Sequence, residues 1–473
     1  MNYEKIGFKS GIEVHQQICS KKLFCSCSTD FKEEKQQIEF IRKLKASKSE
    51  IGEIDAAAKF EELKNREFVY HGFNNEFCLV DCDSEPPHKV NEEALETALQ
   101  VAILLKLRIP QVIIPMRKVV LDGSACSSFQ RTMIVGLESE NSFIETSKGR
   151  VKVSQLCLEE DACKIMKTEK NKVHYSLSRQ GIPLLEIRTE PDIKSPEQLR
   201  EAAEYISMVV KSTGKAKGGI GTIRQDVNLS IKKGNRVEIK GFQDIRDIKK
   251  VVEKEVKRQL KVKKVKSEVR KVNSDATTSF LRPMPGSARM YPETDVRPIE
   301  TKNLVKSIKL PDLISDKIKK IEKKYKISKD LAKELIKKSI DLEDYVKKYK
   351  KLDAKTILKV LIRIPKDIKT RHKLDISVLN EGNFDFVLEK LNKNEINLDA
   401  VLDILIAKIK GEKVDFKKFK CVSNKELEQE IKKLIEKNKD LSIKALMGII
   451  MGKYRGKCDG RKVIEILKKY KEV

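Results

Sequence analysis

Residues Leu158–Asp192 read LEEDACKIMKTEKNKVHYSLSRQGIPLLEIRTEPD, and this stretch decides the predicted fold of the chain. It begins with three adjacent acids: Glu159, Glu160 and Asp161. A fourth acid, Glu186, follows about one hairpin's length later within the apolar run Ile182–Ile187. The pattern predicts neighbouring strands that carry carboxylates into a partly buried setting.

A buried carboxylate is unfavourable unless a positive charge pairs with it. Arg179, Arg188 or a metal ion can supply that charge to Glu186. Mg²⁺ is bound by a few carboxylates together with phosphate oxygens, so acids on neighbouring strands suit it. A salt-bridged hairpin without a metal explains the same residues, and this stretch alone leaves both interpretations open.

The bulk composition indicates an intracellular globular protein. The chain has 473 residues, which suggests about three domains, and 40% of them are hydrophobic. No apolar run approaches the roughly 20 residues of a membrane span, and the N-terminus has no signal-peptide pattern. We therefore expect a cytoplasmic protein with no membrane partner. Its ten cysteines are then thiols or metal ligands and not a disulfide framework.

The chain is strongly basic, with 99 Lys and Arg against 71 Asp and Glu and a net charge of +28. Such a charge favours a polyanionic partner, above all nucleic acid. A genome-wide bias towards lysine explains the same composition. Tryptophan is absent and aromatic residues make up 5%, which argues against a stacking platform for single strands.

The first 300 residues differ from the remainder. They contain several short β-rich runs: 111–114, 118–121, 227–231 and 236–239. Apolar residues at helical spacing predict helices over Asn91–Leu107 and Asp247–Leu260. This part is predicted to be α+β with a mixed or antiparallel sheet. Beyond residue 300, short Lys-rich amphipathic helices replace the strands. The predicted domains are 1–300, an all-α domain at 301–410 and a helical tail at 411–473.

One strand pattern carries polar residues on alternate positions. Residues 223–230 place four polar side chains on one face: Arg224, Asp226, Asn228 and Ser230. Glu238 and Lys240 share one face of the next predicted strand. This combined face is either exposed to solvent or the floor of a polar cleft. The preceding Gly-rich turn at 214–222 is a plain loop or an approach for a phosphate group.

Many motifs, in order, resemble the B/E family of glutamyl-tRNA(Gln) amidotransferase subunits. They include SGIEVHQQ, KLFCSC, DSEPPHKVNEEAL, MRKVVLDGS, LEEDA, SRQGIPLLEIRTEPDI, GIGTIRQDVNLSI, RVEIKGFQDI and RPMPGSARMYPETD. The resemblance covers residues 1–300 closely and the tail segment 446–469 more loosely. Within the family, EVHQQ and SEPPH look like the archaeal E-type protein.

The resemblance implies a ligase that uses ATP and Mg²⁺. Such a protein phosphorylates the γ-carboxylate of glutamate on misacylated tRNA(Gln), and ammonia then displaces the phosphate. The implied fold is a cradle-like α+β domain followed by a helical domain and tail. The implied partner is an asparaginase-like D-type subunit that releases ammonia from glutamine, in a heterotetramer. Nothing in the chain resembles an amidase or asparaginase site, so we expect it to make no ammonia itself. Two alternatives are a non-catalytic tRNA-binding relative and a B-type subunit of a three-subunit enzyme.

The resemblance also implies site residues. The implied Mg²⁺ ligands are Glu13, His15, Glu160 and Glu186. Candidates for catalysis are Glu160, Arg179, Asp226, Asn228, Glu238 and Lys240. Candidates for ATP phosphates are Arg224, Gly219 and Gly221. Candidates for tRNA contact in the tail are Lys453, Arg455, Lys457 and Arg461. Adjacent acids on a strand face opposite ways, so Glu159 competes with Glu160 for its role.

Four cysteines form a second candidate metal set: Cys25, Cys27, Cys78 and Cys82. They are compatible with structural Zn²⁺, although a C-x-C pair is less typical than C-x₂-C. Buried or reduced free thiols are the alternative. One departure from the family is larger than the others. The archaeal E-type protein carries an insertion resembling part of an aspartyl-tRNA synthetase, and here only Asn273–Leu281 fill its place.

Overall fold

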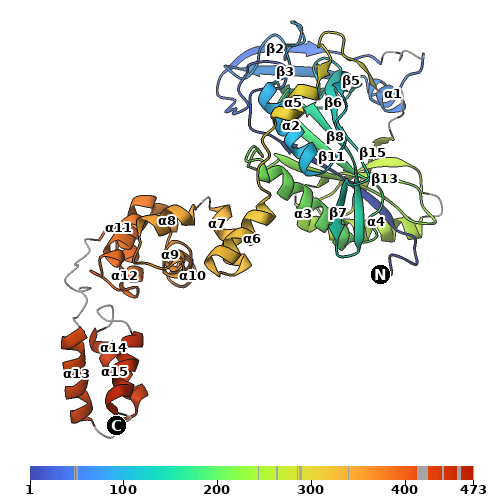
Figure 1. The fold of residues 1–473 in the computed structure, drawn as a ribbon. Coiled ribbons are helices and arrows are strands. Elements are labelled where there is room, and N and C mark those ends of the chain that lie inside the picture. The colour runs from blue at the N-terminus through green and yellow to red at the C-terminus, as the bar shows by residue number, and fades with distance from the viewer. Residues whose placement is uncertain are drawn as a thin grey trace. The chain divides into compact units, whose positions relative to one another are not determined.

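The computed structural model describes residues 1–473 except 47, 49–51, 243, 263–264, 285, 287–289, 339, 413–423, 439–440, 455–459 and 472–473. The chain divides into two compact units, Met1–Ile314 and Ser315–Val473. Figure 1 shows strands in the first unit and helices in the second. The predicted layout, an α+β part followed by helices, is confirmed at this level.

An eleven-stranded sheet organises the first unit. Its strands run in the order β15 (Thr278–Pro283), β14 (Glu268–Val272), β13 (Val237–Phe242), β12 (Ile223–Ser230), β1 (Lys9–Gln17), β11 (Pro183–Thr189), β8 (Gly149–Glu160), β6 (Phe129–Leu137), β5 (Pro115–Val119) and β16 (Met290–Pro292), with β7 (Phe143–Thr146) beside β8. Strands β13 and β14 are parallel and the other described pairs of this sheet are antiparallel, so the sheet is mixed.

The opening stretch forms part of two sheets. Strands β8 and β11 lie side by side, so the acids of LEED and PLLEI are neighbours as expected. The residues between them leave for a second, four-stranded sheet instead of forming one simple hairpin. Its strands are β2 (Gln36–Arg42), β3 (Glu67–Phe73), β10 (Lys172–Ser176) and β9 (Lys164–Thr168). A short pair joins β17 (Ile299–Glu300) to β4 (Val112–Ile113).

Helices cover one face of the large sheet (Figure 1). The helical segments of this unit are α1 (Ala56–Glu62), α2 (Glu92–Leu104), α3 (Pro196–Ser212), the 3₁₀ turn η1 (Ile245–Asp247), α4 (Ile248–Lys261) and α5 (Lys302–Ser307). Both helices predicted from periodicity, α2 and α4, are confirmed. Their apolar faces join Ile12 and Val14 of β1 in one core, which leaves the opposite face of β1 for polar side chains.

The second unit is helical and has two separate hydrophobic clusters. Its segments are α6 (Ile314–Tyr325), α7 (Lys329–Lys337), α8 (Leu342–Lys348), α9 (Ala354–Leu358), the π-helical η2 (Lys359–Arg363), α10 (Ile364–Arg371), the 3₁₀ turn η3 (Ile376–Val378), α11 (Glu381–Asn392), α12 (Ala400–Ile409), α13 (Asn424–Lys437), α14 (Ile443–Tyr454) and α15 (Gly460–Lys471). None of the helices in the described ranges is long and apolar enough to cross a membrane.

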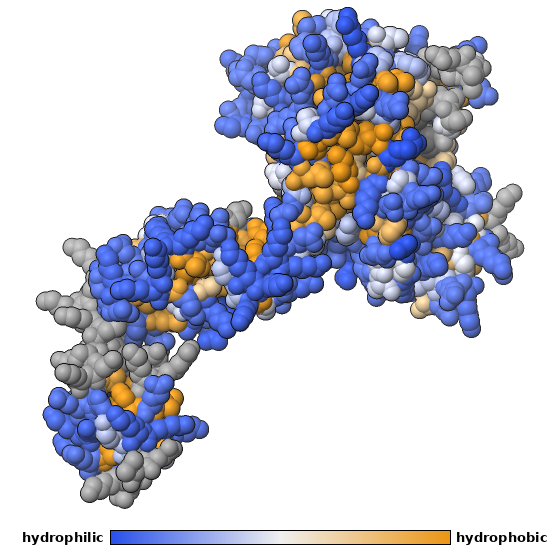
Figure 2. All heavy atoms as spheres, in the orientation of Figure 1, coloured by the Kyte–Doolittle hydropathy of each residue, from blue (hydrophilic) through white to orange (hydrophobic). Residues whose placement is uncertain are grey.

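The surfaces seen in Figure 2 are mainly hydrophilic in both units, as the Lys-rich composition predicts. Apolar side chains gather in one area of the first unit (Figure 2).

Candidate functional site

Polar side chains of the large sheet line a cleft of about 480 Å³ on the face opposite the helices. The lining includes Glu13, His15, Lys118, Glu159, Asp161, Glu186, Arg188, Arg224, Asp226, Asn228, Glu238 and Lys240. The face of β12 and β13 that the sequence left undecided is therefore the floor of a cleft.

The ladder register brings the acids together. Glu13 of β1 lies opposite Arg188 of β11 on one side and opposite Asp226 of β12 on the other. His15 lies opposite Glu186 in the β1–β11 pair. Because side chains alternate along a strand, Glu13 and His15 point into the cleft while Ile12 and Val14 enter the core.

Glu13, His15 and Glu186 form a candidate metal group. One ligand atom from each lies within 4.8 Å of the other two. His15 Nε2 is 3.1 Å from Glu186 Oε2. Burial lowers the pKa of His15, but the hydrogen bond and charge of Glu186 outweigh burial, so this pKa is raised overall. Burial and the charge of Glu186 raise the pKa of Glu13. Carboxylates favour Mg²⁺ or Mn²⁺, and an imidazole is a compatible further ligand.

A second acid group adjoins the first through Glu13. Glu13, Asp226 and Glu238 also place ligand atoms within 4.8 Å of one another. Lys240 Nζ lies 2.6 Å from Asp226 Oδ2 and 2.6 Å from Glu238 Oε1. Burial lowers the pKa of Lys240, but these carboxylates outweigh it and raise that pKa overall. Lys240 therefore supplies the positive charge that this group requires.

Lys118 bridges the acids from β8 and β11. Its Nζ lies 2.6 Å from Glu159 Oε1 and 3.7 Å from Glu186 Oε2. Burial raises the pKa of Glu186, but Lys118 and His15 outweigh burial and hold it well below the usual value. Glu186 is thus ionised at neutral pH although its side chain is only 3% exposed.

Arg224 and Asp161 form one wall of the cleft. Arg224 donates to Asp161 Oδ1 over 2.7 Å, and Gln17 donates to Asp161 Oδ2 over 2.5 Å. Burial raises the pKa of Asp161, but Arg224 outweighs it, so this carboxyl has a lowered pKa. With Arg188, Lys118 and Lys240, the cleft offers several cations beside its acids, which is an arrangement suited to anionic groups held with a metal ion.

A larger cavity of about 810 Å³ lies elsewhere in the first unit, between α2 and residues 295–308. Its lining is mostly apolar, with Leu95, Leu99 and Val296 among its residues. The candidate metal-ligand groups found among the described residues all lie outside this cavity. The smaller cleft is the candidate active site because the clustered ionisable groups lie there.

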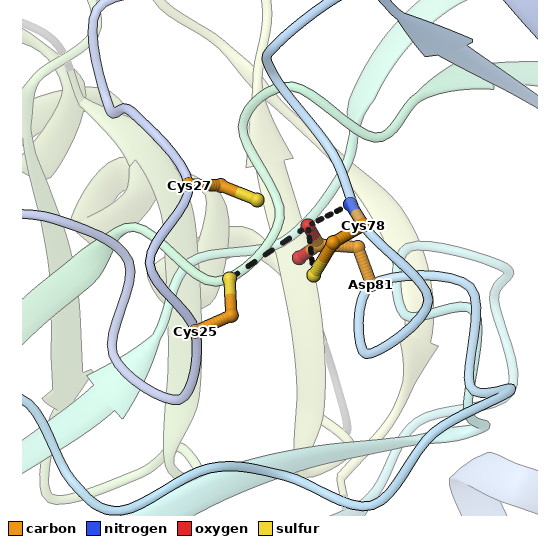
Figure 3. A group of neighbouring side chains, drawn as sticks. All are labelled: Cys25, Cys27, Cys78 and Asp81. Carbon is orange, nitrogen blue, oxygen red and sulfur yellow. Dashed lines mark hydrogen bonds between the residues drawn. The ribbon is translucent and has the colours of Figure 1, made fainter.

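Three cysteines and one aspartate form a separate group, shown in Figure 3. One ligand atom from each of Cys25, Cys27, Cys78 and Asp81 lies within 4.8 Å of the others. Bonds from the Cys25 and Cys27 thiols lower the pKa of Cys78 to about 2. Burial, followed by the charge of Cys78, raises the pKa of Asp81 to about 6, against the opposing effect of Lys22. The predicted fourth cysteine, Cys82, lies outside this group.

Comparisons with known proteins identify the family. Residues 8–306 match the family described as the GatB/GatE catalytic domain. The chain belongs to this family. It is 33% identical to the E subunit of glutamyl-tRNA(Gln) amidotransferase from Methanocaldococcus jannaschii, and the match covers 100% of both chains. It is also 33% identical to the E subunit from Archaeoglobus fulgidus (99% of this chain, 98% of the relative) and 30% identical to that from Methanosarcina acetivorans (99% and 98%).

The first of these matches extends over 632 residues, whereas this GatB/GatE family member has 473. Part of the relative's sequence thus has no counterpart here. At the place where the resemblance predicts a missing insertion, β14 and β15 join through a short turn. Asn273 N donates to Thr277 O over 2.9 Å, and Ala276 adopts a φ of 65°.

Most of the predicted site residues meet in the cleft. They are Glu13, His15, Glu186, Arg224, Asp226, Asn228, Glu238 and Lys240. Glu160 does not. It accepts from the Arg131 backbone N–H over 3.1 Å and faces away from Glu186. The carboxylate beside Glu186 is therefore Glu159, and not Glu160 as the resemblance implies, because adjacent strand residues face opposite ways.

Other predicted residues lie outside the cleft lining. Arg179 donates to the carbonyl oxygens of Ala162 and Cys163, so it anchors a loop behind Asp161. Gly219 and Gly221 lie in the turn before β12, with φ of 115° and 81°. In the tail, Lys453 pairs with Glu430 at 2.8 Å. Arg455, Lys457 and the side chain of Arg461 lie outside the described residues.

Sequence reasoning missed Lys118 and Asp81, and it left Asp161 and Glu159 without assigned roles. Lys118 stands in the quoted motif MRKVVLDGS, and Asp81 stands three residues after Cys78, so both carried a local signal. Their roles depend on strands and loops that meet only in the folded chain.

Proposed function

We propose that this chain is the amidating subunit of a Glu-tRNA(Gln) amidotransferase. The observation that carries the proposal is the joint presence of Glu13, His15 and Glu186 in one cleft with a surrounding set of cations. The family membership and the names of the archaeal relatives support it. In the proposed reaction, a γ-carboxylate oxygen takes the terminal phosphoryl group of ATP and ADP leaves. Ammonia then forms the C–N bond as phosphate departs, and it loses a proton.

Glu13, His15 and Glu186 would hold a Mg²⁺ ion, with Glu159 beside them. When bound, such an ion neutralises developing charge on phosphate oxygens. Lys118 keeps Glu159 and Glu186 oriented, and Arg188 lies beside both Glu186 and Glu13. Arg224, held by Asp161, is positioned to contact an anionic substrate group. The protein contributes mainly positioning and charge neutralisation, which is what phosphoryl transfer requires.

The cleft argues against a purely tRNA-binding role. A protein that only bound the polyanion would gain nothing from clustered carboxylates, because they repel phosphates. Here the acids are buried, paired and held in strand register. That cost in desolvation is understandable when the group binds a cation during a reaction.

We propose two macromolecular partners. The first is tRNA(Gln) charged with glutamate, contacted in part by the basic helices of residues 411–473. The second is a D-type glutaminase subunit of the asparaginase-like class, which supplies ammonia. The E-type motifs and the archaeal relatives favour this pairing over a B-type subunit in a three-subunit enzyme.

The test uses the purified full-length chain with Glu-tRNA(Gln), ATP and Mg²⁺. Ammonium chloride should serve as nitrogen donor and give Gln-tRNA(Gln). Glutamine should serve only after an asparaginase-like partner is added. Product formation from glutamine by this chain alone, or no product with ammonium under any condition that binds tRNA, would overturn the proposal.

A further inference from the structure

The thiol group lies away from the cleft and has its own supporting contacts. Cys25 and Cys27 follow β1, whereas Cys78 and Asp81 belong to the turn after β3. Figure 3 shows the three sulfur atoms and the Asp81 carboxylate directed towards a common centre. Three sulfur donors with one oxygen donor suit a borderline-soft divalent ion such as Zn²⁺.

Asp81 is oriented towards the sulfurs by its own loop. Its Oδ2 accepts from the Cys78 backbone N–H over 3.1 Å. The same oxygen lies 3.8 Å from Cys78 Sγ and 3.9 Å from Cys25 Sγ. Asp81 is only 4% exposed, so its carboxylate is committed to this interior position.

Cys82, the next residue, turns the other way. It belongs to a hydrophobic cluster with Phe68, Tyr70, Cys126 and Cys163. Burial raises the pKa of Cys82 to about 11, so this thiol stays protonated and behaves as a small apolar residue. The predicted set of four cysteines is thus corrected to three cysteines and Asp81.

Lys22 holds the aspartate from behind. Its side chain is fully buried, and its Nζ donates to Asp81 Oδ2 over 3.0 Å. The same ammonium donates to Glu76 O over 2.8 Å and to Leu177 O over 3.0 Å. These three bonds use the complete donor capacity of a lysine, so the position of Nζ is determined by the fold.

We infer that Cys25, Cys27, Cys78 and Asp81 bind a thiophilic divalent ion, and that Lys22 is the positioning residue for the Asp81 ligand. Three thiolates and one carboxylate carry more negative charge than a divalent ion neutralises. The buried ammonium of Lys22 offsets part of that excess. A second-sphere partner of this kind commonly changes metal affinity by about 10-fold to 100-fold.

The same contacts connect the thiol group to the loop before β11. Gln180 Nε2 donates to Asp81 O over 2.8 Å, and Leu23 N donates to Gly181 O over 2.7 Å. Gly181 N in turn donates to Asp161 O over 3.0 Å, and Asp161 holds Arg224 in the cleft. A bound ion therefore rigidifies residues 177–181, which lead into the strand that carries Glu186.

The test is Co²⁺ and Zn²⁺ binding by the reduced full-length chain. The wild type should bind one thiolate-coordinated ion, and Cys82→Ser should bind it equally well. Asp81→Asn and Lys22→Met should bind it about 10-fold or more weakly. Metal removal should speed amide hydrogen exchange at residues 177–181 in the wild type and in Cys82→Ser.

Asp81→Cys keeps the experiment decisive if Asp81→Asn or Lys22→Met fails to fold. It should bind Co²⁺ with a stronger sulfur-to-metal charge-transfer band, because one more thiolate is bound. An unchanged band in Asp81→Cys, loss of binding in Cys82→Ser, or a wild-type chain that binds no thiophilic metal when reduced would each overturn the inference. None of these measurements depends on amidotransferase activity.

Discussion

His15 Nε2 and Glu186 Oε2 lie 3.1 Å apart, and the two residues face each other in the register of the β1–β11 pair. The contact joins residues that are 171 positions apart in the chain. It couples their protonation, because the Glu186 carboxylate raises the pKa of His15 while His15 helps to lower that of Glu186. A metal ion that binds here must replace this proton-mediated contact.

Replacing Glu186 or Glu13 with glutamine should abolish ATP-dependent amidation. Each change removes a charged oxygen from the candidate metal group, whereas the amide keeps the shape and much of the hydrogen bonding. Binding of tRNA should stay within a few fold. Ammonium-dependent formation of Gln-tRNA(Gln) measures the reaction. Glu145→Gln, an exposed acid paired with Arg150, is the matched control. Near wild-type amidation by either cleft variant would remove that residue from the metal group.

Metal binding at this group should strengthen as pH rises. Glu13 and His15 both have raised pKa values, so each holds its proton to a higher pH than usual. Both must lose that proton to act as ligands, and binding therefore releases protons. The affinity for Mn²⁺ should fall as pH decreases through the ordinary histidine value of 6.5. Calorimetry in buffers of different ionisation enthalpy measures the proton release. A pH-independent affinity across this range would contradict the proposed ligands.

Lys240→Met should create a second Mn²⁺ site. The substitution removes the ammonium that lies between Asp226 and Glu238, so three neighbouring carboxylates repel one another without compensation. The metal-free variant should unfold at a lower temperature, and Mn²⁺ should restore its stability more than that of the wild type. Electron paramagnetic resonance measures the bound Mn²⁺. Lys240→Arg keeps the charge and should retain the wild-type stoichiometry. An unchanged stoichiometry in Lys240→Met would show that these acids do not form a cation site.

Deletion of residues 411–473 should weaken tRNA binding and reduce its dependence on salt. The helices α13, α14 and α15 share a hydrophobic cluster of their own, so their removal leaves the other clusters intact. For every phosphate that the tail neutralises, its deletion should lower the slope of log affinity against log salt by about 0.9. Amidation at saturating tRNA should largely survive, because the cleft ligands lie in the first unit. Equal affinity and equal salt slope in the truncated chain would show that the tail does not contact tRNA.

The sequence by itself determined which residues share a face. Alternation along residues 223–230 placed Arg224, Asp226 and Asn228 together, and the structure puts all three in the cleft. Helical spacing likewise predicted α2 and α4. These features follow from the backbone period of a single strand or helix, so a local pattern is enough to find them.

Only the tertiary structure decided which of two adjacent residues faces the site. Glu159 and not Glu160 lies beside Glu186, and Asp81 and not Cys82 joins the three thiols. Composition cannot choose between neighbours, because the choice depends on the register of β8 against β11 and on the buried contact of Lys22 with Asp81. Strand pairing and loop packing join segments that are far apart in the chain, and a one-residue shift would reverse every assignment.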